Sequence, residues 1–143
     1  MSEEEKPKPP LSGVIYGQLI YWIVLAGSVI VVLGSVIAFI THDNFASASY
    51  WITSIWQGES TTEIWQGTKM GSLPLNHWYL SRLATGDGLS AFGLSLGVFS
   101  VIPALLGSAI ILYKKKLILY SSLAVIAAMI VAVAMLGLVP IPT

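Results

Sequence analysis

The sequence predicts an all-α membrane protein with three transmembrane helices and a long tryptophan-rich outer segment that bears short interfacial helices. Of the 143 residues, 55% are hydrophobic and only 10% are charged, whereas about a quarter of the residues in a soluble domain carry a charge. Three stretches are apolar over the roughly 20 residues that a helix needs to cross a bilayer. We therefore expect lipid to surround most of the chain.

Composition also excludes several classes of function. Seven basic residues balance seven acidic ones, so the chain has no basic face that would neutralise the phosphates of nucleic acid. It contains no cysteine, which excludes disulfides, thiolate metal sites and cysteine nucleophiles. Nothing in it resembles a phosphate-binding loop, a hydrolase elbow or a pair of catalytic carboxylates. We expect no nucleic-acid partner and no catalytic residue, and hence no enzymatic activity of its own.

The first expected membrane helix spans residues 12–40. A charged, proline-rich tail of residues 1–11 precedes it and lacks the short apolar core of a signal peptide. Tyr16, Tyr21 and Trp22 lie near the start of the helix, and amphipathic aromatic rings favour the headgroup region of a bilayer. They are expected to mark one membrane interface.

Residues 41–88 form a different kind of segment, which is rich in glycine, serine and threonine and carries most of the tryptophans. It is too long to be a simple turn. Residues 46–57 and 73–83 are candidates for two short amphipathic helices that suit a membrane surface. Asp87 is a typical N-cap residue for the helix that follows.

The second and third membrane helices are expected at residues 89–113 and 117–138. The connection between them, residues 114–116, consists of three lysines, and short loops rich in lysine face the cytoplasm by the positive-inside rule. This orientation predicts a multi-pass protein of the cell membrane whose N-terminus is cytoplasmic. Segment 41–88 and the C-terminal residues 139–143 are then outside the cell.

Small residues recur at helical spacing in the first two membrane helices, where they allow two helix backbones to approach closely. Such faces either pack the helices of this chain together or bind helices of other subunits, and the sequence leaves both open. Pro103 is expected to kink the second helix, because its ring removes one backbone hydrogen bond. The predicted packing residues are Gly27, Gly34, Ser90, Gly93, Gly97, Ala104 and Ser108.

The two histidines of the outer segment are the best candidates for chemistry. Histidine and carboxylate side chains are ligands for metal ions, and a quinone pocket needs an apolar slot with a few polar groups at its mouth. No ligand spacing such as HxH or HExxH supports a metal, and an ordinary interfacial aromatic belt has the same composition. No cofactor is therefore assigned. The residues considered are His42, Asp43 and His77 for a metal ion, and His77, Trp78, Tyr79 and Arg82 for a quinone.

Residues 86–137 carry a resemblance to a known family. The pattern within this stretch starts at Gly86-Asp87-Gly88-Leu89 and continues through Gly93, Gly97 and Ile102-Pro103. The lysine turn and an apolar helix complete it. This arrangement resembles a family of small three-helix prokaryotic membrane proteins of unknown function. The chain differs from that pattern in having Ala104-Leu105 after the proline, where a basic residue is expected. The resemblance implies a topology and no activity.

These observations lead to three hypotheses about function. The first is a non-catalytic accessory subunit of a larger prokaryotic membrane complex, with a respiratory or metal-dependent oxidoreductase as the expected class of complex. The second is a small membrane binding protein that holds a quinone or a metal ion in its outer segment. The third is an assembly factor or a homo-oligomer built through Gly93 and Gly97. The expected partners are the lipid bilayer and other membrane subunits.

Overall fold

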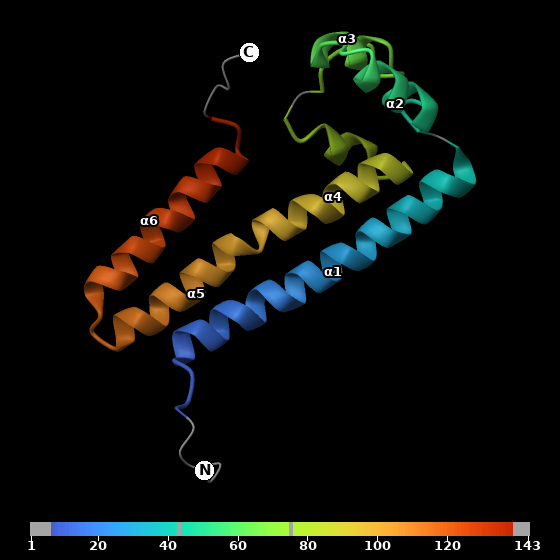
Figure 1. The fold of residues 1–143 in the computed structure, drawn as a ribbon. Helices are drawn as coiled ribbons and strands as arrows, with labels where there is room; N and C mark the ends of the chain where they lie inside the picture. Colours follow the sequence, from blue (N-terminus) through green and yellow to red (C-terminus); the bar gives the residue numbers. More distant parts are fainter. Residues whose placement is uncertain (1–6, 43, 75, 139–143) are drawn as a thin grey trace. The chain divides into compact units, whose positions relative to one another are not determined.

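The computed structural model describes residues 7–42, 44–74 and 76–138, and no strand occurs among them. The fold is therefore all-helical over this part of the chain, as predicted (Figure 1). The helices are α1 (Leu11–Thr41), α2 (Ala48–Trp56), α3 (Thr61–Gln66), the 3₁₀-helix η2 (Trp78–Arg82), α4 (Gly86–Phe99), α5 (Val101–Lys114) and α6 (Ile118–Met135). The chain divides into two compact units, Met1–Ala26 with Ser95–Thr143 and Gly27–Leu94.

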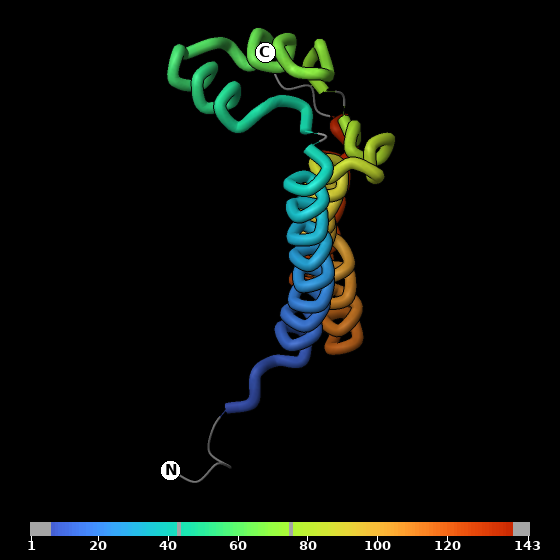
Figure 2. Tube along the Cα trace, turned by 90° about the vertical axis from the view of Figure 1, so that its right-hand side faces the viewer, coloured from blue at the N-terminus to red at the C-terminus, as the bar shows by residue number. Residues whose placement is uncertain are grey.

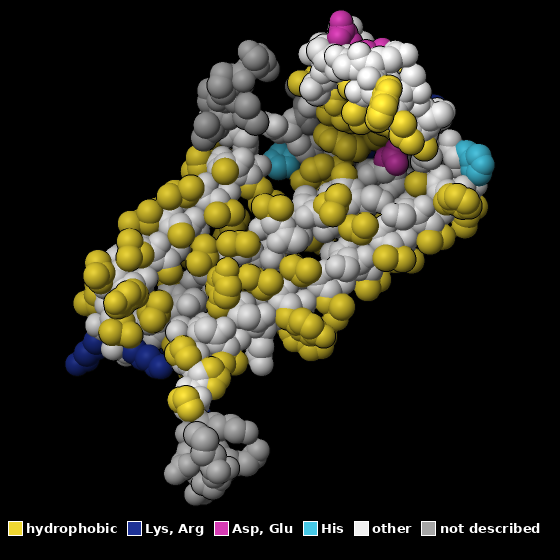
Figure 3. Space-filling model, viewed as in Figure 1, with side chains coloured by type: hydrophobic (Ala, Val, Ile, Leu, Met, Phe, Trp, Pro, Cys, Tyr) yellow, Lys and Arg dark blue, Asp and Glu magenta, His cyan; other side chains and the backbone are white. Residues whose placement is uncertain are grey.

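Among the described residues, three stretches of helix are long and apolar enough to cross a membrane: Leu11–Thr41, Gly86–Lys114 and Ile118–Met135. The second of them combines α4 and α5. Within the chain only 11%, 17% and 11% of their most apolar windows are buried, so extensive apolar surface faces outward. Figure 3 shows hydrophobic side chains along the helices. Apolar patches of this extent are unusual on soluble monomers and are expected on proteins that lipid surrounds.

The second span begins at Gly86, three residues before the expected start at Leu89. Thr85 is the reason, because its hydroxyl accepts a hydrogen bond from the Gly88 amide at 3.2 Å and its carbonyl accepts one from the Leu89 amide. These bonds satisfy amides that would otherwise have no partner in the first turn. Asp87 was expected to cap this helix and instead lies inside its first turn.

The second span is interrupted at Ser100, between the end of α4 and the start of α5. Pro103 lies one turn further along and has no amide proton to donate to the Phe99 carbonyl. Ser100 is buried, and its hydroxyl donates a hydrogen bond to the Gly97 carbonyl at 2.6 Å. The sequence-based expectation of a disturbance around Pro103 agrees with this interruption.

The helices α5 and α6 pack against each other as an antiparallel hairpin (Figure 1). Near the turn, the buried Ser121 hydroxyl donates a hydrogen bond to the Ala109 carbonyl at 2.9 Å. At the other end of the hairpin α6 stops at Met135, three residues before the expected end. Gly137 adopts a left-handed conformation with φ of 66°, and its amide bonds to the Ala134 carbonyl, which closes the helix.

Short helices form the part of the chain between α1 and α4 (Figure 2). Two of them, α2 and η2, fall within the predicted ranges 46–57 and 73–83. The second is much shorter than expected and starts after His77, whose φ of 58° is left-handed and interrupts a helix.

The helix α3 was not predicted. Its start shows a signal that the sequence contains, a capping box in which Ser60 and Glu63 bond reciprocally to each other's backbone amides. Packing against α2 holds it in place, since the Trp51 and Trp65 rings meet edge to face at 5.3 Å and the Tyr50 hydroxyl donates to the Ile64 carbonyl at 2.8 Å.

The capping box gives a pH-dependent contribution to the stability of α3. Two hydrogen bonds to its carboxylate lower the pKa of Glu63 from its usual 4.5. The larger effect comes from the Ser60 side chain and the smaller from the Ser60 backbone amide. The contribution is therefore complete above pH 4.5 and is lost as the pH falls through the lowered pKa. We expect Ser60→Ala to raise the Glu63 pKa towards 4.5, as measured by an NMR titration of its carboxyl carbon.

The matched control is Ser47→Ala, which removes the N-cap of α2. No carboxylate takes part in that cap, so the Glu63 pKa should not change. An unchanged Glu63 pKa in Ser60→Ala would contradict the assignment of the shift to the capping hydroxyl.

Candidate functional site

Phe45 lies at the centre of the unit Gly27–Leu94. Its side chain is 7% exposed, although it belongs to the polar connection between α1 and α2. The Phe45 amide donates a hydrogen bond to the Asp87 carboxylate at 2.9 Å, and its carbonyl accepts one from the Lys69 amide at 2.9 Å. These two bonds join three parts of the unit, the connection after α1, the residues after α3, and the first turn of α4.

The Phe45 ring also contacts η2. The Trp78 ring meets it edge to face with centroids 5.0 Å apart, and the Arg82 guanidinium carbon lies 5.7 Å from its centroid. A cation within about 6 Å of an aromatic face is attracted by the ring electrons. The Nδ1 atom of His77 is hydrogen-bonded to the Tyr79 hydroxyl at 2.9 Å.

Two of the four residues considered for a quinone, Trp78 and Arg82, contact a phenylalanine that the sequence analysis did not single out. Tyr79 contacts the other one, His77, and Trp78. We name the set Phe45, His77, Trp78, Tyr79 and Arg82 the Phe45 cluster. Its rings meet mostly edge to face, with Phe45 buried, the other rings half-buried and Arg82 exposed. Whether it also binds a quinone stays a prediction.

His42 belongs to a different place in the same unit. It lines a pocket of about 470 Å³ together with Asn44, Ser47 and Lys69. The Asn44 Oδ1 atom is buried and has no hydrogen-bond partner among the described residues. Asp43, which the sequence analysis considered as a metal ligand, lies outside the described residues. Within the described part of the chain no three histidine, aspartate or glutamate side chains come together to hold a metal ion.

The predicted small-residue face packs α1 against α4 within the unit Gly27–Leu94. A Cβ atom placed on Gly93 would lie 2.6 Å from the Gly27 carbonyl oxygen, and one on Gly34 would lie 2.6 Å from the Ser90 amide nitrogen. Both distances are too short for a side chain. Gly86 continues this face, since a Cβ atom there would meet the backbone of Ala38.

The remaining predicted packing residues differ from these. A Cβ atom on Gly97 would have no neighbour within 4 Å, whereas Ala104 is fully buried and Ser108 is half-buried. Gly93 therefore packs against α1 of the same chain. Of the two glycines in the homo-oligomer hypothesis, only Gly97 has no neighbour within the chain at its Cβ position.

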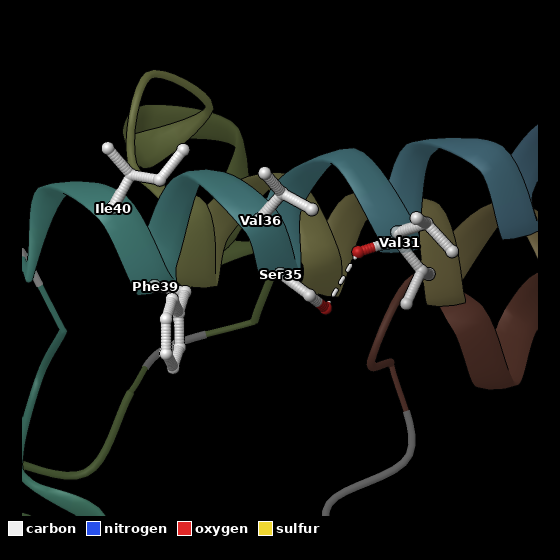
Figure 4. Close-up of a pocket in the computed structure, with 6 residues that line it drawn as sticks. Val31, Ser35, Val36, Phe39 and Ile40 are labelled. Atoms are coloured by element: carbon white, nitrogen blue, oxygen red, sulfur yellow. Dashed lines mark hydrogen bonds between the residues drawn. The ribbon is translucent and has the colours of Figure 1, made fainter.

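The helix α1 also carries an open apolar hollow of about 390 Å³ (Figure 4). Its only polar side chain is Ser35, whose hydroxyl donates to the Val31 carbonyl of the same helix at 2.8 Å. No polar group in the hollow is therefore available for chemistry. The residues that line it are Val31, Val32, Ser35, Val36, Phe39 and Ile40.

Two residues that organise this unit were missed by the sequence analysis, and the sequence carries a signal for each. Phe45 is a lone large apolar residue among polar neighbours, which suggests a buried anchor in an otherwise exposed connection. Gly86 precedes Ser90 by four residues and Gly93 by seven, so it lies on the same helical face.

Comparison with known proteins gives one family and one relative. A protein-family model matches residues 12–138 of the chain. A relative from Archaeoglobus fulgidus, described as an uncharacterized protein, is 27% identical over 136 residues, which cover 89% of this chain and 88% of the relative. No solved structure matches the chain. The resemblance of residues 86–137 to three-helix membrane proteins stays a prediction.

We expect Phe45→Ala to unfold the connection between α1 and α4 locally. Truncating a buried phenylalanine costs about 3 to 5 kcal/mol, and here it also removes the ring that Trp78 and Arg82 contact. Hydrogen exchange of the Lys69 amide, which donates to the Phe45 carbonyl, should become much faster. Phe39→Ala is the control, because Phe39 is 82% exposed on α1. Equal exchange rates in the two variants would contradict a central role for Phe45.

We expect Gly93→Ala to destabilise the chain by about 1 to 3 kcal/mol, because the added methyl group overpacks the contact with Gly27 and Val31. The free energy of unfolding in detergent micelles measures this. Gly97→Ala changes the same residue type one turn later in the same helix, where the methyl group meets no neighbour. Its effect should be neutral or slightly stabilising. Equal destabilisation by both changes would show that the close contact does not matter.

Proposed function

We propose that this chain, which belongs to the protein family whose model matches residues 12–138, is a non-catalytic accessory subunit of a larger prokaryotic membrane complex. In this role its apolar helices pack among lipid and partner helices, and the part of the chain between α1 and α4 binds a partner protein. A respiratory or metal-dependent oxidoreductase is the class of complex we propose, although no residue specifies it.

One observation carries the proposal, an exposed apolar face on α2. Ile52, Ile55 and Trp56 lie three and four residues apart and therefore on one side of the helix, and Trp56 is 90% exposed. The opposite side of the helix already packs against the chain, because the Tyr50 hydroxyl donates a hydrogen bond to the Ile64 carbonyl of α3 and Ser54 is buried. Tryptophan is among the residues that contribute most to protein interfaces. The exposed face lies outside the three candidate spans, and we propose that a partner protein covers it.

The distribution of charge supports a role without transport or catalysis. In the three candidate spans the only charged residues are Asp87, in the first turn of its helix, and Lys114, at the end of the same span. Proton and ion pathways normally place ionisable groups in the membrane interior. The Asp87 carboxylate already accepts a hydrogen bond from the Phe45 amide, which gives it a structural role.

We propose the orientation that the lysines indicate. Lys114, Lys115 and Lys116 form the turn between two candidate spans, and short lysine-rich connections face the cytoplasm. With three spans, the connection between α1 and α4 and the exposed face of α2 are then on the outer side of the cell membrane. The partner we expect for that face is a protein domain on the outer surface.

A second function, a small ligand-binding protein, has one observation in its favour. The pocket beside His42 combines a buried, unpartnered Asn44 oxygen with the side chains of Ser47 and Lys69. Metal analysis and an absorption spectrum of the purified chain test this alternative. A stoichiometric metal ion, quinone or chromophore would favour it over the accessory-subunit proposal.

We expect the chain, purified from its native membrane in mild detergent, to bring other proteins with it in fixed stoichiometry. Changing both Ile52 and Trp56 to serine should remove at least one of them, because it removes the apolar contact of α2. Mass spectrometry of the purified material identifies the chains. The control is Ile130→Ser on α6, where the side chain is 64% exposed, close to the 67% of Ile52, and this variant should keep the protein that α2 binds. Purification of the wild-type chain alone would refute the proposal.

A further inference from the structure

The hairpin of α5 and α6 carries an apolar groove of about 400 Å³ that ends at a lysine. Apolar side chains from both helices line it, with Leu106 and Ile110 on α5 and Val125 on α6. Ser121 also borders the groove, but its hydroxyl already donates a hydrogen bond to the Ala109 carbonyl. The groove therefore has no free polar group along its length and suits a hydrocarbon chain.

One end of the groove is different in character. Tyr113 and Lys114 line it there, and both are exposed at the turn. Lys115 and Lys116 follow directly, and Figure 3 shows basic side chains gathered at this turn. Asp87 is the last acidic residue of the sequence, so α5, α6 and their turn carry three positive charges with no carboxylate to balance them. An anion is the matching partner for this end.

The length of the groove fits one leaflet of a membrane. From Leu106 to Lys114 the helix rises about 12 Å, which is a little less than half of the ~30 Å hydrocarbon core. A lysine at a helix end extends its charged group towards the headgroups while its stem stays among apolar atoms. A molecule in the groove would thus have its tail in one leaflet and its charge at the membrane surface.

We propose that this groove binds an anionic phospholipid, with one hydrocarbon chain between α5 and α6 and the phosphate at Lys114. The apolar lining selects the chain, the cation selects the charge, and the dimensions place both at the right depth. Lys114 is the specific contact because it lines the groove. Lys115 and Lys116 contribute only to the general attraction between the turn and an anionic surface.

The experiment is native mass spectrometry of the full chain in detergent, titrated with phosphatidylglycerol or with phosphatidylcholine of identical acyl chains. We expect one phosphatidylglycerol per chain to bind at clearly lower concentrations than phosphatidylcholine. Lys114→Gln should weaken phosphatidylglycerol binding about five-fold, the factor that corresponds to about 1 kcal/mol for one lysine near a membrane surface. Lys115→Gln and Lys116→Gln remove the same charge from the same turn and should each change the affinity less than two-fold.

A second pair of variants tests the groove itself. Val125→Trp places a large ring in the groove, and Ile110→Trp does so from the facing helix, so each should weaken phosphatidylglycerol binding while the lysines remain. Circular dichroism of each variant checks that the helices are intact. With two such variants on different helices, misfolding of one still leaves the other as a test.

Four results would overturn the proposal. Equal affinity for the two lipids would show that the groove does not recognise the negative charge of the headgroup. An equal loss of phosphatidylglycerol affinity in all three lysine variants would show a general attraction to the turn and no specific contact at Lys114. Unchanged binding in the folded tryptophan variants would place the hydrocarbon chain elsewhere. Displacement of the lipid by glycerol 3-phosphate at similar concentration would identify a site for free phosphate.

Discussion

The unit Gly27–Leu94 depends on the way the backbone of Phe45 is held. Its amide and its carbonyl bond to two segments that are far apart in the sequence, at Asp87 and at Lys69. Buried backbone groups must find partners, and here each partner closes a loop of the chain. Since the ring of the same residue packs against η2, one position fixes the connection after α1, the residues after α3, and the start of α4 together.

This arrangement explains why Asp87 lies inside the first turn of α4. A carboxylate near a helix N-terminus is favoured by the helix dipole, and one oxygen of Asp87 accepts the Phe45 amide. Thr85 is left to cap the helix. The close approach of Gly34 to Ser90, and of Gly93 to Gly27, then holds α1 and α4 against each other without large side chains. In lipid, where apolar burial gives little driving force between helices, such backbone contact is the main source of packing energy.

The sequence predicted those parts of the fold that follow from solvent and period. Three apolar stretches and a lysine turn are visible in composition alone, and α1 extends one residue beyond the predicted 12–40 at each end. Helix ends were less predictable because they depend on single residues. Thr85 begins α4 early and Gly137 ends α6 early.

The Phe45 cluster shows what sequence reasoning lacks. Its members at 77, 78, 79 and 82 are neighbours in sequence and could be considered together, whereas Phe45 contacts two of them from more than thirty residues away. No local period links Phe45 to these positions, so only the folded chain shows that Trp78 and Arg82 contact it. The separation of His42 from this cluster is likewise a tertiary property, because the pocket that His42 lines is formed with Lys69.

The turn between α5 and α6 places a lysine where the backbone favours glycine. A left-handed residue follows four of the described helices, and after three of them the same pair of backbone hydrogen bonds closes the end. After α1 the left-handed residue is His42. Where the bond pair is present it is glycine twice, Gly58 after α2 and Gly137 after α6. At the end of α5 it is Lys116, with φ of 60° and the same pair of hydrogen bonds, from the Lys116 amide to Tyr113 and from the Leu117 amide to Leu112. A side chain in this conformation costs about 1 to 2 kcal/mol. Glycine would remove that cost and one cation with it. The lysine at this position therefore adds a third cation to the turn at a backbone cost that glycine would not have.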